Sequence, residues 1–189
     1  MRRLAAVLLS LMLIPAAASA GWELDAAKSA VRFKTVIYLV NPVRGGFDRF
    51  SGKVVYDEKD VTRSSAEIEI DVSSIHSGIG LRDKDLRSPR FFDAAKFPTA
   101  VFRSKKVEKA GEGRLKVTGD LTLHGVTREV ALDVEGPTAP EKDAEGRERV
   151  LGKATTKISR ESFGMGGLVG SDEVEISIEI SLVRTDGSG

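Results

Sequence analysis

Residues 115–134, LKVTGDLTLHGVTREVALDV, constrain the fold most strongly, because their hydrophobic pattern changes phase half-way along. Apolar positions are odd-numbered up to residue 123 and even-numbered from residue 130. Opposed residues of an antiparallel pair share a face, so a tight turn at His124-Gly125 pairs Val117 with Leu132 and keeps the aliphatic side chains together. Gly125 supplies the positive φ that a two-residue turn usually needs. The sequence therefore predicts a β-hairpin.

The same register makes two further predictions. Thr122 and Thr127 become a cross-strand pair on the other face of the hairpin. Arg128 lies opposite Leu121, on the apolar face and close to the turn. This position indicates either a local twist or a charge at the mouth of an interior space.

Alternation of apolar and polar residues predicts strands elsewhere in the chain. It is most regular in residues 67–72 and 174–182, and further strands are expected near residues 31–41, 53–56, 100–103 and 150–158. We therefore expect an all-β fold, an eight-stranded antiparallel barrel or sandwich. A closed barrel is favoured because closure removes the exposed strand edges. Eight strands leave an interior that side chains fill or that holds one slender ligand.

One segment, residues 73–98, breaks the alternation and predicts a short helical insert. Ser88 followed by Pro89 suits a helix N-terminus, with Phe91, Phe92 and Ala95 on one side of that helix. Residues 81–87 are expected to form a second, shorter helical turn.

The first twenty residues have the pattern of a secretory signal peptide. Arg2 and Arg3 precede an apolar run at residues 4–14, and small residues precede Gly21. We expect cleavage before Gly21, export to the periplasm, and a single domain at residues 21–189; an uncleaved anchor is the alternative. No later stretch approaches the about 20 apolar residues of a membrane helix, so no stable membrane span is expected.

The composition limits which ligands and catalytic groups we expect. Removing Arg2 and Arg3 from the 29 basic residues leaves 27 against 28 acidic residues, which gives no electrostatic basis for nucleic-acid binding. The chain has two histidines and no cysteine, so we expect neither a disulfide nor a metal site. No G-x-S-x-G motif is present, and no catalytic residue or cofactor is predicted.

Several motifs resemble the YceI-like family of exported proteins, and they occur in order along residues 21–189. They include VTGDLTLHGVTR at 117–128, RD at 82–83, LRSP at 86–89, FFD at 91–93 and FPT at 97–99. The resemblance implies a lipocalin-like barrel whose elongated apolar interior accommodates a polyisoprenoid or a similar long-chain lipid. Many members have histidine where this chain has Asp85 and Tyr38, and these departures leave the apolar interior unchanged.

The leading hypothesis is an exported protein that holds a polyisoprenoid or similar amphiphile for transport or storage. Small residues on the inward face, Gly119, Gly152 and Ala154, favour a cavity over a filled core. The expected ligand-binding residues are Phe33, Ile68, Ile70, Phe91, Phe92, Phe102, Leu121, Leu123, Val130, Leu132, Ile176 and Ile178. A polar rim is expected from Arg82, Asp83, His124, Arg128 and Arg160.

Other interpretations stay open. The cluster of Arg82, Asp83 and Arg87 is better explained as an ion-pair network that holds the insert, because surface charges usually do no more than this. The whole protein can also be a solid-cored structural or interaction module without a ligand, or a lipid hydrolase that uses His124. The sequence leaves the oligomeric state open.

Overall fold

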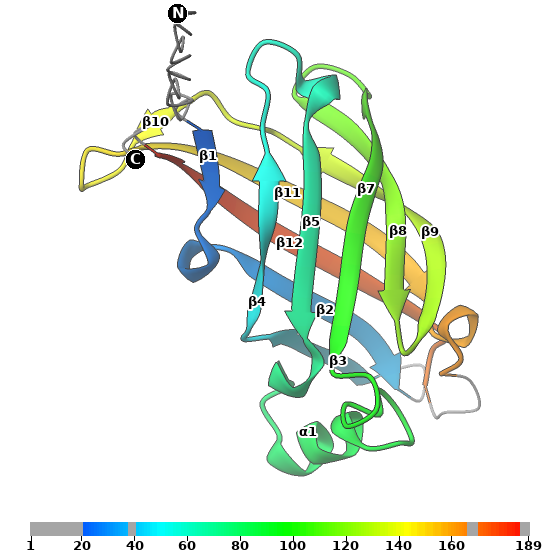
Figure 1. Ribbon diagram of the computed structural model, residues 1–189. Helices are drawn as coiled ribbons and strands as arrows, with labels where there is room; N and C mark the ends of the chain where they lie inside the picture. The colour runs from blue at the N-terminus through cyan, green and yellow to red at the C-terminus, as the bar shows by residue number, and fades with distance from the viewer. Residues whose placement is uncertain (1–20, 38–40, 166–169, 186–189) are drawn as a thin grey trace, which may run out of the picture.

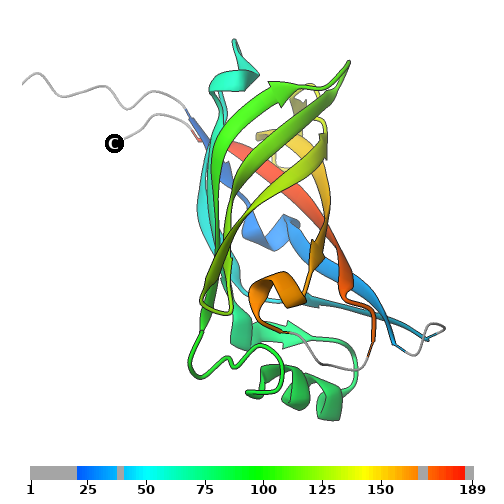
Figure 2. The same cartoon turned by 90° about the vertical axis from the view of Figure 1, so that its right-hand side faces the viewer.

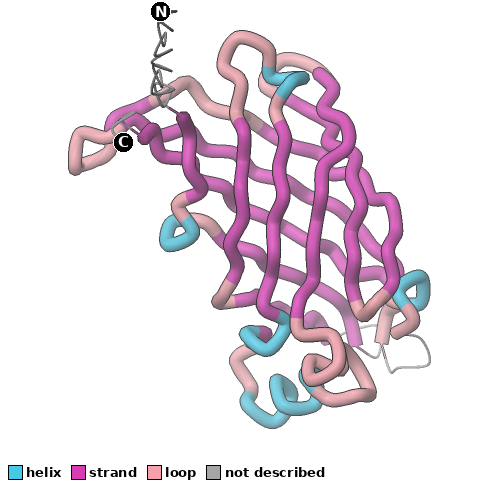
Figure 3. The backbone as a smooth tube through the Cα atoms, viewed as in Figure 1, coloured by secondary structure: helices cyan, strands magenta, loops and turns pink. Residues whose placement is uncertain are grey.

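The strands form one curled antiparallel sheet that wraps around a single interior (Figure 1, Figure 3). The structure is a computed structural model that describes residues 21–37, 41–165 and 170–185. The predicted signal peptide and Tyr38 lie outside the described residues. The hydrogen-bonded order is β4-β5-β7-β8-β9-β11-β12-β2-β3-β6, with β1 paired to β12 and β10 paired to β11.

The elements have the following bounds. The strands are β1 (Gly21–Leu24), β2 (Ala30–Ile37), β3 (Asn41–Phe47), β4 (Phe50–Val55), β5 (Ser65–Asp71), β6 (Ile75–His76), β7 (Thr99–Lys109), β8 (Arg114–Leu123), β9 (Val126–Glu135), β10 (Glu141–Lys142), β11 (Glu148–Ser159) and β12 (Glu173–Thr185). The helices are η1 (Ala26–Lys28), η2 (Val61–Arg63), η3 (Val72–Ser74), α1 (Gly80–Arg87) and η4 (Glu161–Phe163). Gly21 pairs with Thr185, so β1 and the last residues of β12 lie side by side.

The predicted all-β antiparallel fold with a short helix is confirmed, but the strand count of eight was wrong because the described sheet has twelve strands. The missed strands are mostly short. β3 was missed because it contains Gly45-Gly46, and such a glycine pair is typical of turns. In the structure these glycines allow close approach instead, since a Cβ on Gly45 would lie 2.2 Å from the carbonyl oxygen of His76 and 2.5 Å from the ring of Phe33.

The predicted closed barrel is a half-barrel in the described part of the chain. The end strands β4 and β6 are not paired with each other in the sheet order. Backbone bonds beside them extend ladders that already exist: the N–H of Asp48 donates to the carbonyl of Ser74 at 3.3 Å next to the β3-β6 pair, and the N–H of Asp71 donates to the carbonyl of Arg49 at 3.0 Å next to the β4-β5 pair. The long hydrophobic strands are therefore kept from the edge by their order in the sheet rather than by full closure.

The β8-β9 hairpin is confirmed in its predicted register. Val117 pairs with Leu132, and the turn residues His124 and Gly125 have φ angles of 52° and 74°. Two left-handed residues give the turn whose twist suits a two-residue hairpin. The hydroxyl oxygens of Thr122 and Thr127 lie 2.8 Å apart.

The helical insert is present, and the helical turn predicted at residues 81–87 is confirmed, but the helix predicted to begin at Ser88 was wrong. The helix α1 occupies Gly80–Arg87, and residues 88–98 form turns. Ser88 ends the helix, because both its N–H, at 2.9 Å, and its hydroxyl, at 2.6 Å, donate to the carbonyl of Asp85. A proline just after a helix is common because it cannot continue the helix, so Ser88-Pro89 marks a C-terminus here.

The buried core is divided between the two ends of the barrel. At the end that carries α1 and η4 the cluster contains Val72, Ala100, Leu123, Ile158, Phe163 and Met165 (Figure 2). At the other end it contains Trp22, Val150 and Leu182, and the Trp22 ring meets the Tyr56 ring edge-on at 5.7 Å. Between the clusters, inward side chains such as Ile68 and Ile178 are only half-buried. The middle of the barrel is therefore not filled by side chains.

Gly119 of β8 lies beneath the ring of Phe102, which gives the first testable prediction. A Cβ there would lie 2.4 Å from the carbonyl oxygen of Arg103 and 2.7 Å from that ring. We expect Gly119→Ala to lower the free energy of unfolding by about 1–3 kcal/mol, the usual cost of overpacking, in urea titrations. Gly152→Ala is the matched control, because its nearest atom is 3.7 Å away. Equal losses in both variants would contradict the close packing.

Candidate functional site

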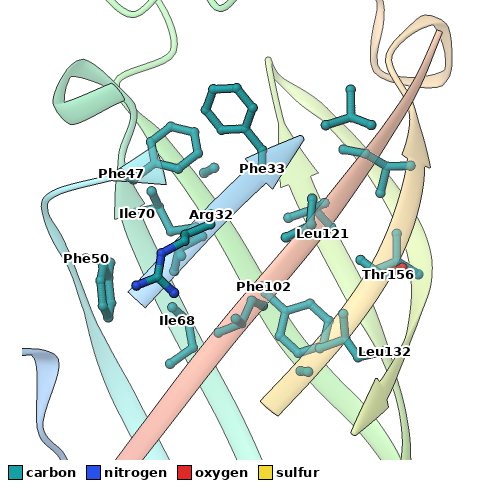
Figure 4. A pocket seen from close by; sticks show the side chains of 18 of the residues that line it. Arg32, Phe33, Phe47, Phe50, Ile68, Ile70, Phe102, Leu121, Leu132 and Thr156 are labelled. Carbon is teal, nitrogen blue, oxygen red and sulfur yellow. The ribbon is translucent and has the colours of Figure 1, made fainter. Parts of the chain in front are cut away.

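A cavity of about 690 Å³ occupies the barrel between the two buried clusters (Figure 4). Its exposed wall is almost entirely apolar. One side of the wall is formed by β5, β7 and β8, where Ile68 pairs with Phe102 and Phe102 pairs with Leu121. On the other side Ile176 of β12 lies between Phe33 of β2 and Thr156 of β11. The alternation of each strand directs these side chains inward.

All twelve residues expected to bind a ligand lie in the cavity wall. They do not occupy equivalent surroundings. Leu123 is buried in the cluster at the α1 end, whereas Ile178 stands half-buried in the open middle. Phe91 and Phe92 come from the turns after α1, and the Phe92 ring meets the Phe47 ring edge-on at 6.1 Å. These aromatic side chains cover part of the α1 end of the cavity.

Several wall residues were missed by the prediction. Leu115, Val117 and Val134 share the inward phase of the β8-β9 hairpin, so the alternation contained a signal for them. Phe47 and Phe50 flank a turn, where no regular alternation marks which way a side chain points.

The predicted polar rim is only partly beside the cavity. Arg82 and Arg160 line it, whereas Asp83, His124 and Arg128 do not. His124 and Arg128 were misplaced because both contact η4: Nδ1 of His124 lies 3.2 Å from the carbonyl oxygen of Phe163, and Nε of Arg128 donates to the carbonyl oxygen of Ser162 at 3.0 Å. Arg128 is exposed despite its pairing with Leu121.

The arginines of the insert have a clear structural role. Arg82 donates from Nε to the Ser77 hydroxyl and from Nη2 to the Ser77 carbonyl, both at 2.7 Å, and that hydroxyl in turn donates to Asp83. Arg87 donates to the carbonyl of Ile75 at 3.0 Å. Of the two interpretations that the sequence left open, the geometry favours a network that holds the insert against the barrel. Arg160 likewise ties down a turn, through a 2.9 Å bond to the carbonyl of Ser171.

The comparison with known proteins agrees with this architecture. Residues 22–182 match the YceI-like domain. The chain belongs to the YceI-like family. A UPF0312 protein of Vibrio parahaemolyticus is 35% identical over 158 residues, which cover 84% of this chain and 83% of that protein. The family predicted from the motifs is therefore confirmed.

Solved structures share the fold of this YceI-like chain. BcnA of Burkholderia cenocepacia is 28% identical with a TM-score of 0.73, over 84% of this chain and 99% of that chain. The YceI protein of Campylobacter jejuni is 28% identical with a TM-score of 0.70, over 76% and 86%. A polyisoprenoid binding domain from Saccharophagus degradans is 19% identical with a TM-score of 0.66, over 88% and 99%, a likeness that shows the fold.

A buried charge cluster of the YceI-like chain lies outside the cavity wall. The Arg149 side chain, 9% exposed, donates from Nη1 to Asp25 at 2.8 Å and to Ser181 at 2.6 Å, and from Nη2 to Asp143 at 2.9 Å. The hydrogen bond from Arg149 lowers the pKa of Asp25 despite the opposing effect of burial. These groups tie the start of η1 and the segment before β11 to β11 and β12.

The described residues offer neither a metal site nor a membrane-spanning helix. No group of three or more histidine, aspartate or glutamate side chains is placed to hold a metal ion. Among the same residues, none of the helices combines the length and the hydrophobicity needed to cross a membrane.

Proposed function

We propose that this YceI-like protein binds a long-chain lipid of the polyisoprenoid class in its cavity. The observation that carries the proposal is a cavity of about 690 Å³ in the place where a barrel would otherwise have its core. Its wall is apolar and is formed by half-buried side chains. Exposing that wall to water is unfavourable, and an apolar chain would cover it. The volume falls within the range typical of small-molecule sites.

The physical chemistry of the wall favours a chain-like ligand. Each buried methylene contributes about 0.8 kcal/mol, so several isoprene units can bind tightly with little polar recognition, less the cost of ordering the chain. The resemblance in fold to the polyisoprenoid binding domain from Saccharophagus degradans supports the same ligand class.

The biological role that follows is transport or storage of the lipid in the periplasm. The signal-peptide pattern of residues 1–20 supports export. The alternative of a solid-cored module is disfavoured by the divided core. The alternative of a hydrolase that uses His124 is disfavoured because this side chain does not line the cavity and contacts the Phe163 carbonyl instead.

Native mass spectrometry of residues 21–189, purified without detergent, tests the proposal. We expect a reproducible extra mass that solvent extraction identifies as a long-chain lipid. Polyprenols of increasing length, added to the lipid-free protein, should bind more tightly until the cavity is full, because each added unit buries more apolar surface. A bare protein mass that stays unchanged after incubation with polyprenols would contradict lipid binding.

A further inference from the structure

The end of the barrel that carries α1 exposes large apolar side chains. Leu81 of α1 is 84% exposed and Ile79, its N-cap, is 54% exposed. No residue of α1 is buried, so the helix makes little use of apolar contact with the barrel. It is held instead by the polar bonds of Arg82 and Arg87 to the chain around β6. Within the described residues, the apolar side chains of Ile79 and Leu81 are therefore largely uncovered.

This exposed surface is continuous with the cavity. Leu81, which is almost fully exposed, also belongs to the cavity wall, together with Leu86 and Arg90 of the same insert. Both views of the ribbon place α1 at the lower end of the barrel (Figure 1, Figure 2). Leu81 therefore lies where the cavity wall reaches the surface at this end.

The same segment has an excess of positive charge. Residues 79–98 contain five basic and three acidic residues, in a chain whose residues 21–189 are close to neutral. Arg82 and Arg87 donate to hydroxyl and carbonyl groups, which do not neutralise their charge. Lys84 and Lys96 are exposed as well. Of the acidic residues, Asp85 is paired with Arg90 at 3.4 Å.

We propose that the α1 end docks on an anionic lipid bilayer, with Ile79 and Leu81 in the interface and the basic side chains of residues 79–98 at the head groups. Segments that lie in a membrane interface place apolar side chains at the acyl boundary and lysine or arginine side chains at the head groups. Juxtaposed basic residues are attracted to anionic lipid surfaces. The role of this docking rests on the proposed function. A docked protein turns its cavity toward the bilayer, in which a water-insoluble lipid is dissolved, so the lipid moves between bilayer and cavity without crossing water.

Vesicle flotation with residues 21–189 tests the docking. The vesicles contain either phosphatidylcholine alone or phosphatidylcholine with phosphatidylglycerol. We expect binding to the anionic vesicles, weakened by salt, and at least about tenfold weaker binding of the double variant Ile79→Ser/Leu81→Ser, because it loses two apolar contacts with the interface. The matched control is Val55→Ser/Leu151→Ser, which replaces side chains that are 46% and 49% exposed on strands away from α1. The control should bind like the parent.

The outcomes separate docking from lipid binding. Absence of parent binding to anionic vesicles, or unchanged binding by the Ile79/Leu81 variant, would overturn the docking proposal. So would a dimer of the parent that the same variant abolishes in sedimentation analysis, since a second copy would then cover this surface. Native mass spectrometry of the same proteins reports cavity occupancy independently: a parent that docks but never carries lipid refutes the proposed function and leaves the docking intact.

Discussion

Tryptophan in place of Ile178 is expected to lower the lipid content of the purified protein at least about tenfold, a loss of about 1.4 kcal/mol in binding free energy. Ile178 stands in the middle of β12, half-buried and opposite Ala154, which leaves the larger ring room to enter the cavity. The ring would occupy the volume that the ligand needs. Because it displaces no packed side chain, the unfolding midpoint in urea should stay close to that of the parent. Native mass spectrometry measures the occupancy.

Leu123→Trp provides the contrast. Leu123 is 6% exposed and belongs to the buried cluster with Phe163 and Met165. A larger ring there must displace packed atoms, so we expect a loss of about 1–3 kcal/mol in unfolding free energy. If Ile178→Trp retained its lipid, or if both variants lost the same stability, the distinction between an open middle and a packed end would be wrong.

Replacing Arg149 by methionine is expected to lower the free energy of unfolding by about 3–5 kcal/mol, the range for removing one partner from a buried ion pair. The change leaves the carboxylates of Asp25 and Asp143 buried without their shared partner. Urea titration at neutral pH measures the loss. The control is Arg32→Met, which breaks a 2.7 Å pair with Glu179 between side chains that are 55% and 54% exposed. Such surface pairs contribute about 0–1 kcal/mol, and a similar loss in both variants would contradict the argument.

Acid should remove the stabilisation that the same cluster provides. The hydrogen bond from Arg149 lowers the pKa of Asp25. For Asp143 burial raises the pKa, but the hydrogen bonds from Arg149 and Arg147 outweigh burial and leave the pKa well below the ordinary 3.8. Both carboxyls have a lower pKa folded than unfolded, so their stabilisation is present above the unfolded value and is lost as the pH falls through the folded one. We expect the parent to lose stability below about pH 4, and Arg149→Met to lose less over the same range. Parallel pH curves for the two proteins would contradict this assignment.

The predictable parts of the fold were those that alternation decides. The phase change between Leu123 and Val130 fixed the β8-β9 register, and the same periodicity identified cavity-wall residues such as Ile68 and Ile176. Alternation decides which face a side chain is on, but not what that face meets. Leu123 and Ile178 therefore had the same pattern, although one is packed and the other faces open space.

The remaining features depend on contacts between distant segments. Gly45 is needed because the ring of Phe33 lies over it, and in the sequence alone Gly45-Gly46 is indistinguishable from a turn. Ser88 can begin or end a helix, and the choice was made by its bonds to Asp85. His124 and Arg128 contact η4, more than thirty residues later in the sequence. No local pattern specifies such partners.

The pairing of Gly21 with Thr185 has a practical consequence for handling the protein. Both ends of the described chain leave the barrel at the corner away from α1 (Figure 1). A tag joined after Thr185 and captured on a solid support would therefore hold every molecule in one orientation, with Leu81 and the opening of the cavity turned toward the solution. A sensor surface prepared in this way would present the same end of the barrel to every vesicle or lipid that flows past.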